Sequence, residues 1–237
     1  MNVLVLVPAR DEARSLPDVV RLLRAAQPAA GILVVDDAST DATAQLLPTL
    51  GVEWLCLCEH TGVGGAIRAG LRHAMRRGYD TVVRVDGDGQ HPADQIDRVL
   101  APIRSGEADA VIGSRYRQAA GYRTPGWRRL AQRGLAAWVS ATAGRRITDP
   151  TSGFWAFGPR AVRLLASHHP AGYAEPELLL LLAHNGLRVV EVPIEMRRRM
   201  TGRTSLTGGR LGLVGARTVL ALLILPLRKT VPDAGDD

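Results

Sequence analysis

Apolar runs alternate with amphipathic stretches along the first half of the chain. Short runs rich in valine, leucine and isoleucine have the length and composition of strands buried on both faces, and they cover residues 3–7, 32–35, 53–58, 81–85 and 108–112. Between them, apolar positions recur at helical spacing, over residues 15–26, 39–50, 63–77 and 94–105. This strict βα alternation predicts a doubly wound, mostly parallel sheet with helices on both faces.

The second half of the chain does not follow this alternation of strands and helices. Glycine and proline in residues 118–129 predict a loop, and residues 130–143 predict a helix. A turn over residues 149–154 leads into a short apolar strand, a strongly apolar helix covers 175–184, and a last strand covers 187–192. Because no repeat or linker divides the chain, we expect one α/β domain over residues 1–196. Residues 197–237 would form a C-terminal extension with a basic and an apolar helical part.

Size and charge narrow the choice of function. A chain of 237 residues, 46% of them hydrophobic, is long enough for one large domain with its own core. The formal net charge of +7 favours an anionic partner, which would be a phosphate compound, a nucleic acid or a membrane surface. Aromatic residues make up only 4% of the chain and we find no nucleic-acid-binding motif, so a basic nucleic-acid-binding module is the weaker reading.

Cysteine use and hydropathy bear on the location of the protein. Cys56 and Cys58 are neighbours on one face of a predicted strand, an arrangement that suits reduced core thiols in a cytoplasmic protein. The amino-terminal apolar run is too short for a signal peptide. The apolar stretch at residues 211–227 is interrupted by Arg217, which makes it a poor membrane span. We expect it to pack on the domain or lie along the inner face of the cell membrane.

A polar cluster follows each predicted strand of the first half. Right-handed crossovers bring the carboxyl ends of parallel strands to one edge of a sheet, where ligands bind in this class of fold. The clusters begin at Pro8, Asp36, His60, Asp86 and Gly113. Their convergence predicts a ligand site along that edge.

Asp86 and Asp88 are the most informative pair. They end a buried strand one residue apart, so both carboxylates fall on one side of an extended segment, with Gln90 close behind. Mg²⁺ and Mn²⁺ usually take only one or two protein carboxylates and complete their shell with water and substrate phosphates. The alternative is a solvated turn after the strand, but the position on the predicted ligand edge favours a metal that bridges the protein to a diphosphate.

Two other clusters have both a structural and a binding interpretation. Asp37 or Ser39 could cap the following helix, whereas a carboxylate at a strand end can also accept hydrogen bonds from a ribose. Glu12 could bind a ligand or simply favour the start of a helix. The glycines at 62, 64 and 65 could form a tight turn or allow a ligand to approach the helix N–H groups.

Together these motifs resemble the family-2 inverting glycosyltransferases of the GT-A fold. The closest resemblance is to the dolichol-phosphate mannosyltransferase-like group, the polyprenyl-phosphate sugar synthases. It extends over almost the whole chain and is carried by VPARDEARSL, VVDDASTDAT, GVGGAIRAGL, DGDGQHP, GSRY, DPTSGFWAF and VEVPIEMRRRMTGRTSL. The third motif departs from the usual Asn-x-Gly-Lys-Gly, because His60-Thr61-Gly62-Val63-Gly64 has no lysine to bind phosphate.

The resemblance implies a role for each cluster. A divalent cation, Mg²⁺ or Mn²⁺, would be held by Asp86, Asp88 and Gln90. The donor nucleotide would be held by Pro8, Ala9, Arg10, Glu12, Asp36, Asp37, Gly64, Asp86 and Gly87. The acceptor or its phosphate would be bound by Arg115, Ser152, Arg203 and Ser205. Catalysis would involve Asp88, Asp149, Glu177 and Arg199, with Glu175 a weaker candidate than Glu177 and with Arg197 or Arg203 able to replace Arg199.

The implied reaction moves a hexose from a GDP- or UDP-linked sugar to a polyprenyl phosphate, with inversion, at the cytoplasmic face of the membrane. Basic side chains in the C-terminal extension fit an anionic lipid acceptor. Three alternatives stay open. The first is the same transfer to a soluble hydroxyl acceptor, for which Glu177 or Asp149 would act as base. The others are a nucleotidyltransferase and the nucleic-acid-binding module. A homodimer is also open.

Overall fold

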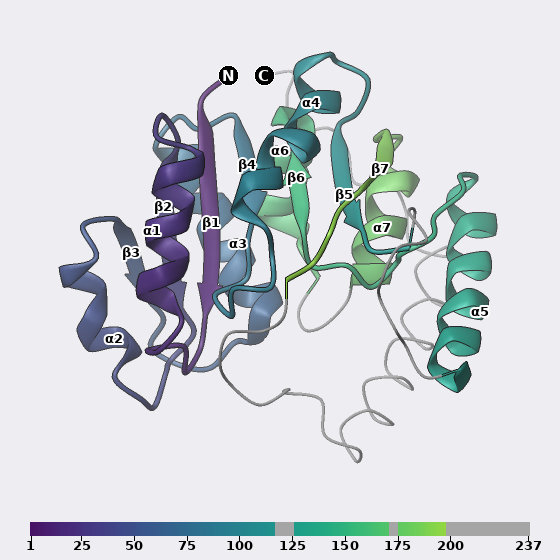
Figure 1. Cartoon of the computed structure of the whole chain (residues 1–237). Coiled ribbons are helices and arrows are strands. Elements are labelled where there is room, and N and C mark those ends of the chain that lie inside the picture. The colour runs from purple at the N-terminus through teal and green to yellow at the C-terminus, as the bar shows by residue number, and fades with distance from the viewer. Residues whose placement is uncertain (117–125, 171–174, 198–237) are drawn as a thin grey trace.

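A seven-stranded sheet forms the centre of the molecule (Figure 1). The computed structural model of the chain describes residues 1–116, 126–170 and 175–197. The strands are β1 (Val3–Ala9), β2 (Gly31–Asp36), β3 (Glu53–Cys56), β4 (Thr81–Arg84), β5 (Ala110–Ser114), β6 (Trp155–Phe157) and β7 (Val189–Pro193). Their order across the sheet is β3-β2-β1-β4-β6-β5-β7. The prediction of a mostly parallel α/β sheet in a single domain is confirmed.

One strand runs against the others. Strand β6 is antiparallel to both of its neighbours, and it separates β4 from β5. Residue Trp155 of β6 lies opposite Arg84 of β4 and Ile112 of β5. The turn that precedes β6 is thereby placed beside the carboxyl ends of β4 and β5, so a segment from the second half of the chain enters the candidate site.

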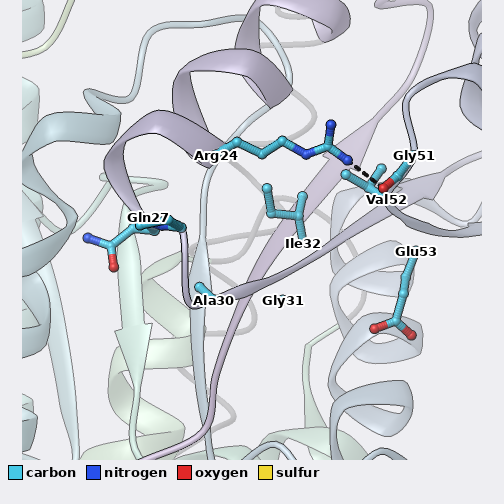
Figure 2. Close-up of a pocket in the computed structure, with 9 residues that line it drawn as sticks. Arg24, Gln27, Ala30, Gly31, Ile32, Gly51, Val52 and Glu53 are labelled. Carbon is cyan, nitrogen blue, oxygen red and sulfur yellow. Dashed lines mark hydrogen bonds between the residues drawn. The ribbon is translucent and has the colours of Figure 1, made fainter.

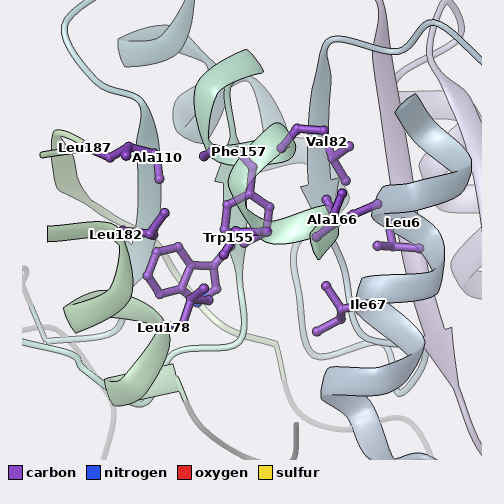
Figure 3. Packing of buried hydrophobic residues seen from close by; sticks show 14 of the residues in the cluster. Leu6, Ile67, Val82, Ala110, Trp155, Phe157, Ala166, Leu178, Leu182 and Leu187 are labelled. Carbon is purple, nitrogen blue, oxygen red and sulfur yellow. The ribbon is translucent and has the colours of Figure 1, made fainter. Parts of the chain in front are cut away.

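Helices cover both faces of the sheet and bury two apolar clusters. They are α1 (Leu16–Ala26), α2 (Thr43–Leu46), α3 (Gly62–Arg76), α4 (Ile96–Arg104), α5 (Gly126–Ala143), α6 (Pro159–His168) and α7 (Glu175–His184). Helices α1 and α4 pack on one face, and α3, α5, α6 and α7 pack on the other. On this second face the stacked rings of Trp155 and Phe157 lie among aliphatic side chains from Leu6, Ile67 and Leu178 (Figure 3).

Three helical segments differ from the sequence prediction. The helix expected over residues 39–50 is only α2 and a 3₁₀ turn over Leu47–Thr49. The reason is that the Asp11 carboxylate accepts the N–H groups of Thr40 and Asp41, which keeps that stretch in a loop. Helix α5 begins at Gly126, inside the predicted loop, and α6 was not predicted.

The prediction of core thiols is wrong. Cys56 and Cys58 are both free and both exposed. Among the described residues, β3 is the last strand on its side of the sheet and has a neighbouring strand on one side only. Trp54, in the same strand as Cys56, is also 45% exposed. The short apolar run therefore identified the strand but did not show that it is the outermost strand of the sheet.

The described parts of the chain contain no helix that is both long and apolar enough to cross a bilayer. The expected apolar helix at residues 211–227 lies outside the described residues, as does all of the C-terminal extension after Arg197. The division of the chain at residue 196 stays a prediction.

Candidate active site

The carboxyl ends of the parallel strands assemble most of the residues expected at the site. A β-carbon built at Gly87 would lie 3.4 Å from the carbonyl oxygen of Pro8, 3.5 Å from Cβ of Ala9 and 3.6 Å from Cγ of Glu12. The loop after β4 thus touches the loop after β1. The backbone N–H of Asp37, which follows β2, donates to the carbonyl of Ala9 at 2.9 Å.

Carboxylates and backbone N–H groups tie the first two of these loops together. Asp11 has a positive φ of 55°, and its carboxylate accepts the N–H of Thr40 at 2.6 Å. These hydrogen bonds, with the backbone bond from Thr40 foremost, lower the pKa of Asp11. The N–H of Glu12 donates to the hydroxyl of Thr43 at 2.9 Å. The result is a preformed double loop at the expected nucleotide position.

Asp36 and Asp37 are buried, and both carboxylates are engaged within the protein. Asp36 accepts the hydroxyl and the N–H of Ser39. Asp37 accepts the N–H of Thr61 at 2.7 Å and faces Nδ1 of His60 at 2.7 Å. Asp37, which follows β2, therefore caps the start of α3. The geometry supports the structural interpretation of Asp36 and Asp37. Their contact with a nucleotide stays a prediction.

The start of α3 requires glycine. Gly62 has a φ of +81°, a conformation that L side chains rarely adopt. A β-carbon at Gly65 would lie 2.2 Å from Oγ1 of Thr61, too close for any side chain. Gly64 is buried in the first turn. This glycine-rich start brings backbone N–H groups of the helix close to the loop that holds Asp37.

A histidine organises the loop that carries Asp86 and Asp88. The N–H of Asp86 donates to Nδ1 of His91 at 2.9 Å, and the imidazole stacks on Phe154 with 5.1 Å between ring centres. Burial of the imidazole lowers the pKa of His91, in agreement with Nδ1 acting as the acceptor of this hydrogen bond. Asp88 is 6% exposed and accepts the N–H of Gln90 at 2.9 Å. His91 is a structural member of the site that sequence reasoning did not assign.

Arg84 was also missed. Its side chain is 5% exposed, and it donates to Asp86 at 3.1 Å and to Glu175 at 3.2 Å. Burial alone would lower the pKa of Arg84, but the two carboxylates outweigh burial and raise it. An arginine inside an otherwise apolar strand is a signal that could have identified it, because a buried charge requires a partner.

Arg115 and Asp149 form a second buried pair. Asp149 is fully buried and accepts Nε and Nη2 of Arg115, each at 2.7 Å. The N–H of Arg115 donates to the same carboxylate at 3.0 Å. This bidentate geometry holds the guanidinium at the end of β5. It gives Asp149 the role of orienting Arg115, which counts against Asp149 as a proton acceptor.

Glu191 on β7 holds the backbone of the turn that carries Asp149. Its buried carboxylate accepts the N–H of Thr148 at 2.9 Å and the N–H of Asp149 at 2.8 Å. Ser152, in the same turn, donates its hydroxyl to the carbonyl of Gly113 at 2.6 Å. Ser152 is fully buried, so its geometry supports a structural role in the turn. No sequence pattern pointed to Glu191.

The Asp86–Asp88 pair fits a metal that is shared with a substrate. In residues 1–116, 126–170 and 175–197, no group of three or more acidic, histidine or cysteine side chains is arranged to hold a metal ion. Two neighbouring carboxylates on a ligand edge are nevertheless the donor set that Mg²⁺ or Mn²⁺ uses when phosphates and water supply the other ligands. The residues present therefore fit a cation that binds together with a diphosphate.

Comparison with known proteins identifies the family. The model of "Glycosyl transferase family 2" matches residues 4–164, which include the strand-end loops, the Asp86–Asp88 pair and the turn before β6. The chain belongs to glycosyl transferase family 2. It is a glycosyltransferase, as the sequence motifs predicted.

Two relatives match this glycosyltransferase over most of its length. The undecaprenyl-phosphate mannosyltransferase of Micrococcus luteus is 35% identical over 228 residues, which cover 90% of this chain and 90% of the relative. The polyprenol monophosphomannose synthase of Mycolicibacterium smegmatis is 34% identical over 218 residues, covering 88% and 82%. The predicted resemblance to the polyprenyl-phosphate sugar synthases is confirmed.

Solved structures confirm the GT-A fold. Glucosyl-3-phosphoglycerate synthase from Mycobacterium tuberculosis, in complex with phosphoglyceric acid, superimposes with a TM-score of 0.72 and 22% identity, over 99% of this chain and 82% of that one. A second structure of that enzyme, in complex with Mn²⁺, UDP and glucosyl-3-phosphoglycerate, gives a TM-score of 0.71 and 22% identity over the same shares.

Some predicted residues of the glycosyltransferase site cannot be located in the described chain. Arg199, Arg203 and Ser205 lie outside the described residues. Arg197 is described: its N–H donates to the carbonyl of Gln90 at 2.9 Å, and its guanidinium pairs with Asp94 at 2.7 Å. The C-terminal extension therefore begins beside the Asp86–Asp88 loop.

A pocket of about 420 Å³ lies at the opposite edge of the sheet (Figure 2). It is lined by the end of α1, the start of β2 and the residues before β3, and Arg24 crosses toward the carbonyl of Gly51. No sequence-predicted site residue lines it, so this pocket does not belong to the candidate active site.

Proposed function

We propose that this enzyme transfers a hexose from a nucleoside-diphosphate sugar to a polyprenyl phosphate, with a divalent metal ion and with inversion. The strongest support is the match along nearly the whole chain to relatives named for mannosyl transfer to undecaprenyl phosphate and for polyprenol monophosphomannose synthesis. The Mn²⁺ and UDP bound by glucosyl-3-phosphoglycerate synthase support the metal and the donor class.

The geometry suggests how the chain's own residues would act. Asp86 and Asp88 would hold the cation, which when bound neutralises charge on the departing diphosphate. The double loop after β1 and β2, including Arg10 and Glu12, would hold the nucleotide. Arg115, fixed by Asp149, would face an anionic group of the acceptor or donor.

An anionic acceptor also fits the state of Asp149. A lipid-phosphate oxygen is already negatively charged and needs no general base, whereas a hydroxyl acceptor needs a carboxylate to take its proton. Because Asp149 is buried and bound twice by Arg115, Glu177 is the remaining candidate base for a hydroxyl acceptor. The C-terminal extension would bring the enzyme to the cytoplasmic membrane face as a peripheral protein.

The test is a panel of GDP- and UDP-linked hexoses with a short polyprenyl phosphate and Mn²⁺ or Mg²⁺, followed by analysis for nucleoside diphosphate and glycolipid. We expect Asp88→Asn or excess chelator to lower glycolipid formation about 1000-fold, because the charge on the leaving group is no longer neutralised. Asp97→Asn, the same change on the exposed surface of α4, is the control.

Two results would contradict this proposal. Full activity of Asp88→Asn, or full activity in chelator, would remove the metal from the mechanism. Sugar transfer to a soluble hydroxyl compound, with no product from polyprenyl phosphate, would replace the lipid acceptor by the alternative class.

A further inference from the structure

We infer that Glu175 acts through Arg84 to set the net negative charge around Asp86 and Asp88, and that it is a positioning residue for the cation these carboxylates would hold. This inference rests on the proposed function, because it concerns the affinity of the Asp86–Asp88 pair for a divalent ion. It gives Glu175 a role different from the catalytic one for which the sequence made it a weaker candidate than Glu177.

The argument begins with a line of alternating charges. Glu175 at the start of α7 lies 3.2 Å from Nη1 of Arg84, and Nε of Arg84 lies 3.1 Å from Oδ1 of Asp86. The Arg84 and Glu175 side chains are only 5% and 14% exposed. Charges in such an environment interact more strongly than charges in water. Any change at Glu175 therefore reaches Asp86 through the arginine.

The backbone of Gly153 packs closely against Asp86 and Arg84. A β-carbon built at Gly153 would lie 3.0 Å from Oδ2 of Asp86 and 3.1 Å from Nη2 of Arg84. The backbone of the turn before β6 thus rests directly on the ion pair. Packing against Gly153 therefore adds to the hydrogen bond that holds Arg84 beside Asp86, and Nε2 of His91 lies 3.8 Å from Oδ2 of the same carboxylate.

The net charge of the group explains why Glu175 would affect the affinity for a cation. Arg84 offsets the charge of Asp86, and Glu175 in turn offsets that of Arg84. With Asp88, the group retains two negative charges, which matches a divalent cation. Without the charge of Glu175, Arg84 would neutralise Asp86 and leave only one negative charge for the metal, and cation affinity would fall.

A purely structural role for the pair makes a different prediction. If Arg84 and Glu175 only fasten the start of α7 to β4, the loss of Glu175 lowers stability and leaves cation affinity unchanged. The two explanations therefore differ in a binding measurement that needs neither sugar donor nor acceptor.

The experiment titrates the whole protein with Mn²⁺ and follows the free ion by electron paramagnetic resonance, with and without inorganic pyrophosphate. We expect Glu175→Gln to raise the dissociation constant for Mn²⁺ about tenfold. Glu175→Asp, which keeps the charge, should stay within about threefold of the wild type. So should the double variant Arg84→Gln/Glu175→Gln, which removes both charges and restores the balance.

Glu107→Gln is the matched control, since Glu107 is exposed and lies just before the amino end of β5, whereas the Asp86–Asp88 loop lies at the carboxyl ends of the strands. Circular dichroism and thermal unfolding establish that each variant is folded. If Glu175→Gln is not folded, Arg84→Gln decides, because removal of the positive charge should tighten Mn²⁺ binding about tenfold, whereas a purely structural role leaves it unchanged. Unchanged Mn²⁺ affinity in folded Glu175→Gln would overturn the inference. So would a double variant or a Glu175→Asp variant that binds as weakly as Glu175→Gln.

A failure of the proposed function gives a separate result. If the wild type binds no Mn²⁺, or if Asp88→Asn binds it equally well, the metal site itself is wrong and this inference falls with it. If binding is lost in Asp88→Asn and unaffected in Glu175→Gln, only the role of Glu175 is wrong.

Discussion

The candidate active site has a half proposed to bind the donor and a half proposed to bind the metal, and different forces hold them together. The donor half consists of the loops after β1 and β2 and the start of α3. There, carboxylates accept hydrogen bonds from backbone N–H groups and hydroxyls, as Asp11 does from Thr40 and Asp37 from Thr61. The metal half consists of the ends of β4 and β5, the turn before β6 and the start of α7, and it contains buried ion pairs such as Arg115–Asp149.

This difference has consequences for both stability and function. A carboxylate that accepts neutral N–H groups needs only a well-formed loop, and each bond adds a modest amount to stability. A buried ion pair must recover the cost of removing both charges from water, so losing one partner is far more damaging than the pair is stabilising. The metal half should therefore be the more sensitive to substitution.

Removal of one charge from the metal half should have the largest effect. Asp149→Asn takes away the anionic partner of Arg115, whose side chain is only 16% exposed, and we expect it to lower the free energy of unfolding by about 3 kcal/mol. Urea unfolding followed by circular dichroism measures this. Asp97→Asn breaks an exposed pair and should cost less than about 0.5 kcal/mol. Equal losses in the two variants would show that burial of an ion pair does not set the cost of breaking it.

A second prediction concerns the pH dependence of stability. His169 is buried at the end of α6, and its Nδ1 lies 2.9 Å from the carbonyl of Pro170. Its Nε2 has no hydrogen-bond partner in the part of the chain that the structure describes. Burial lowers the pKa of His169 to about 4. Below the unfolded pKa of about 6.5 the unfolded chain takes up a proton that the folded protein does not, so stability falls as the pH falls from 6.5 toward 4.

The measurement compares wild type and His169→Gln by urea unfolding at pH 8, 7 and 5. The wild type should lose about 2 kcal/mol more than the variant between pH 7 and pH 5. Between pH 8 and pH 7 the two should change in parallel, because the imidazole is neutral in both states. Parallel behaviour over the whole range would mean that His169 does not stay neutral in the folded protein.

The donor half should show the smallest effect. Asp37→Asn replaces one acceptor oxygen by an NH₂ group, and one of the bonds to Thr61 or His60 is lost. We expect the free energy of unfolding to fall by about 1 kcal/mol. Asp18→Asn, in an exposed pair with Arg21, serves as the control. A loss as large as that of Asp149→Asn would remove the contrast between the two halves.

Sequence reasoning was most successful where the signal is local. The apolar runs located β1, β2, β4 and β5, and the carboxyl-edge rule correctly gathered Glu12, Gly87 and Asp37 from separate strands. It was least successful for α6 and for the antiparallel β6, whose three residues carry too little pattern to reveal its partners. It also placed Cys56 in the core, since periodicity does not report whether a strand has a neighbour on both sides.

The α/β class and the family followed from the amino-acid sequence alone, as did the prediction that ligands bind at the carboxyl ends of the strands. These depend on residue periodicity and on motifs whose members are near one another in the chain. The three-dimensional structure was needed to show that Arg84 joins Asp86 to Glu175, 91 positions away, and that Glu191 on β7 accepts the N–H of Asp149. Such pairs form because a buried charge must find an opposite charge or a hydrogen-bond donor wherever the fold provides one, and that choice has no local signature.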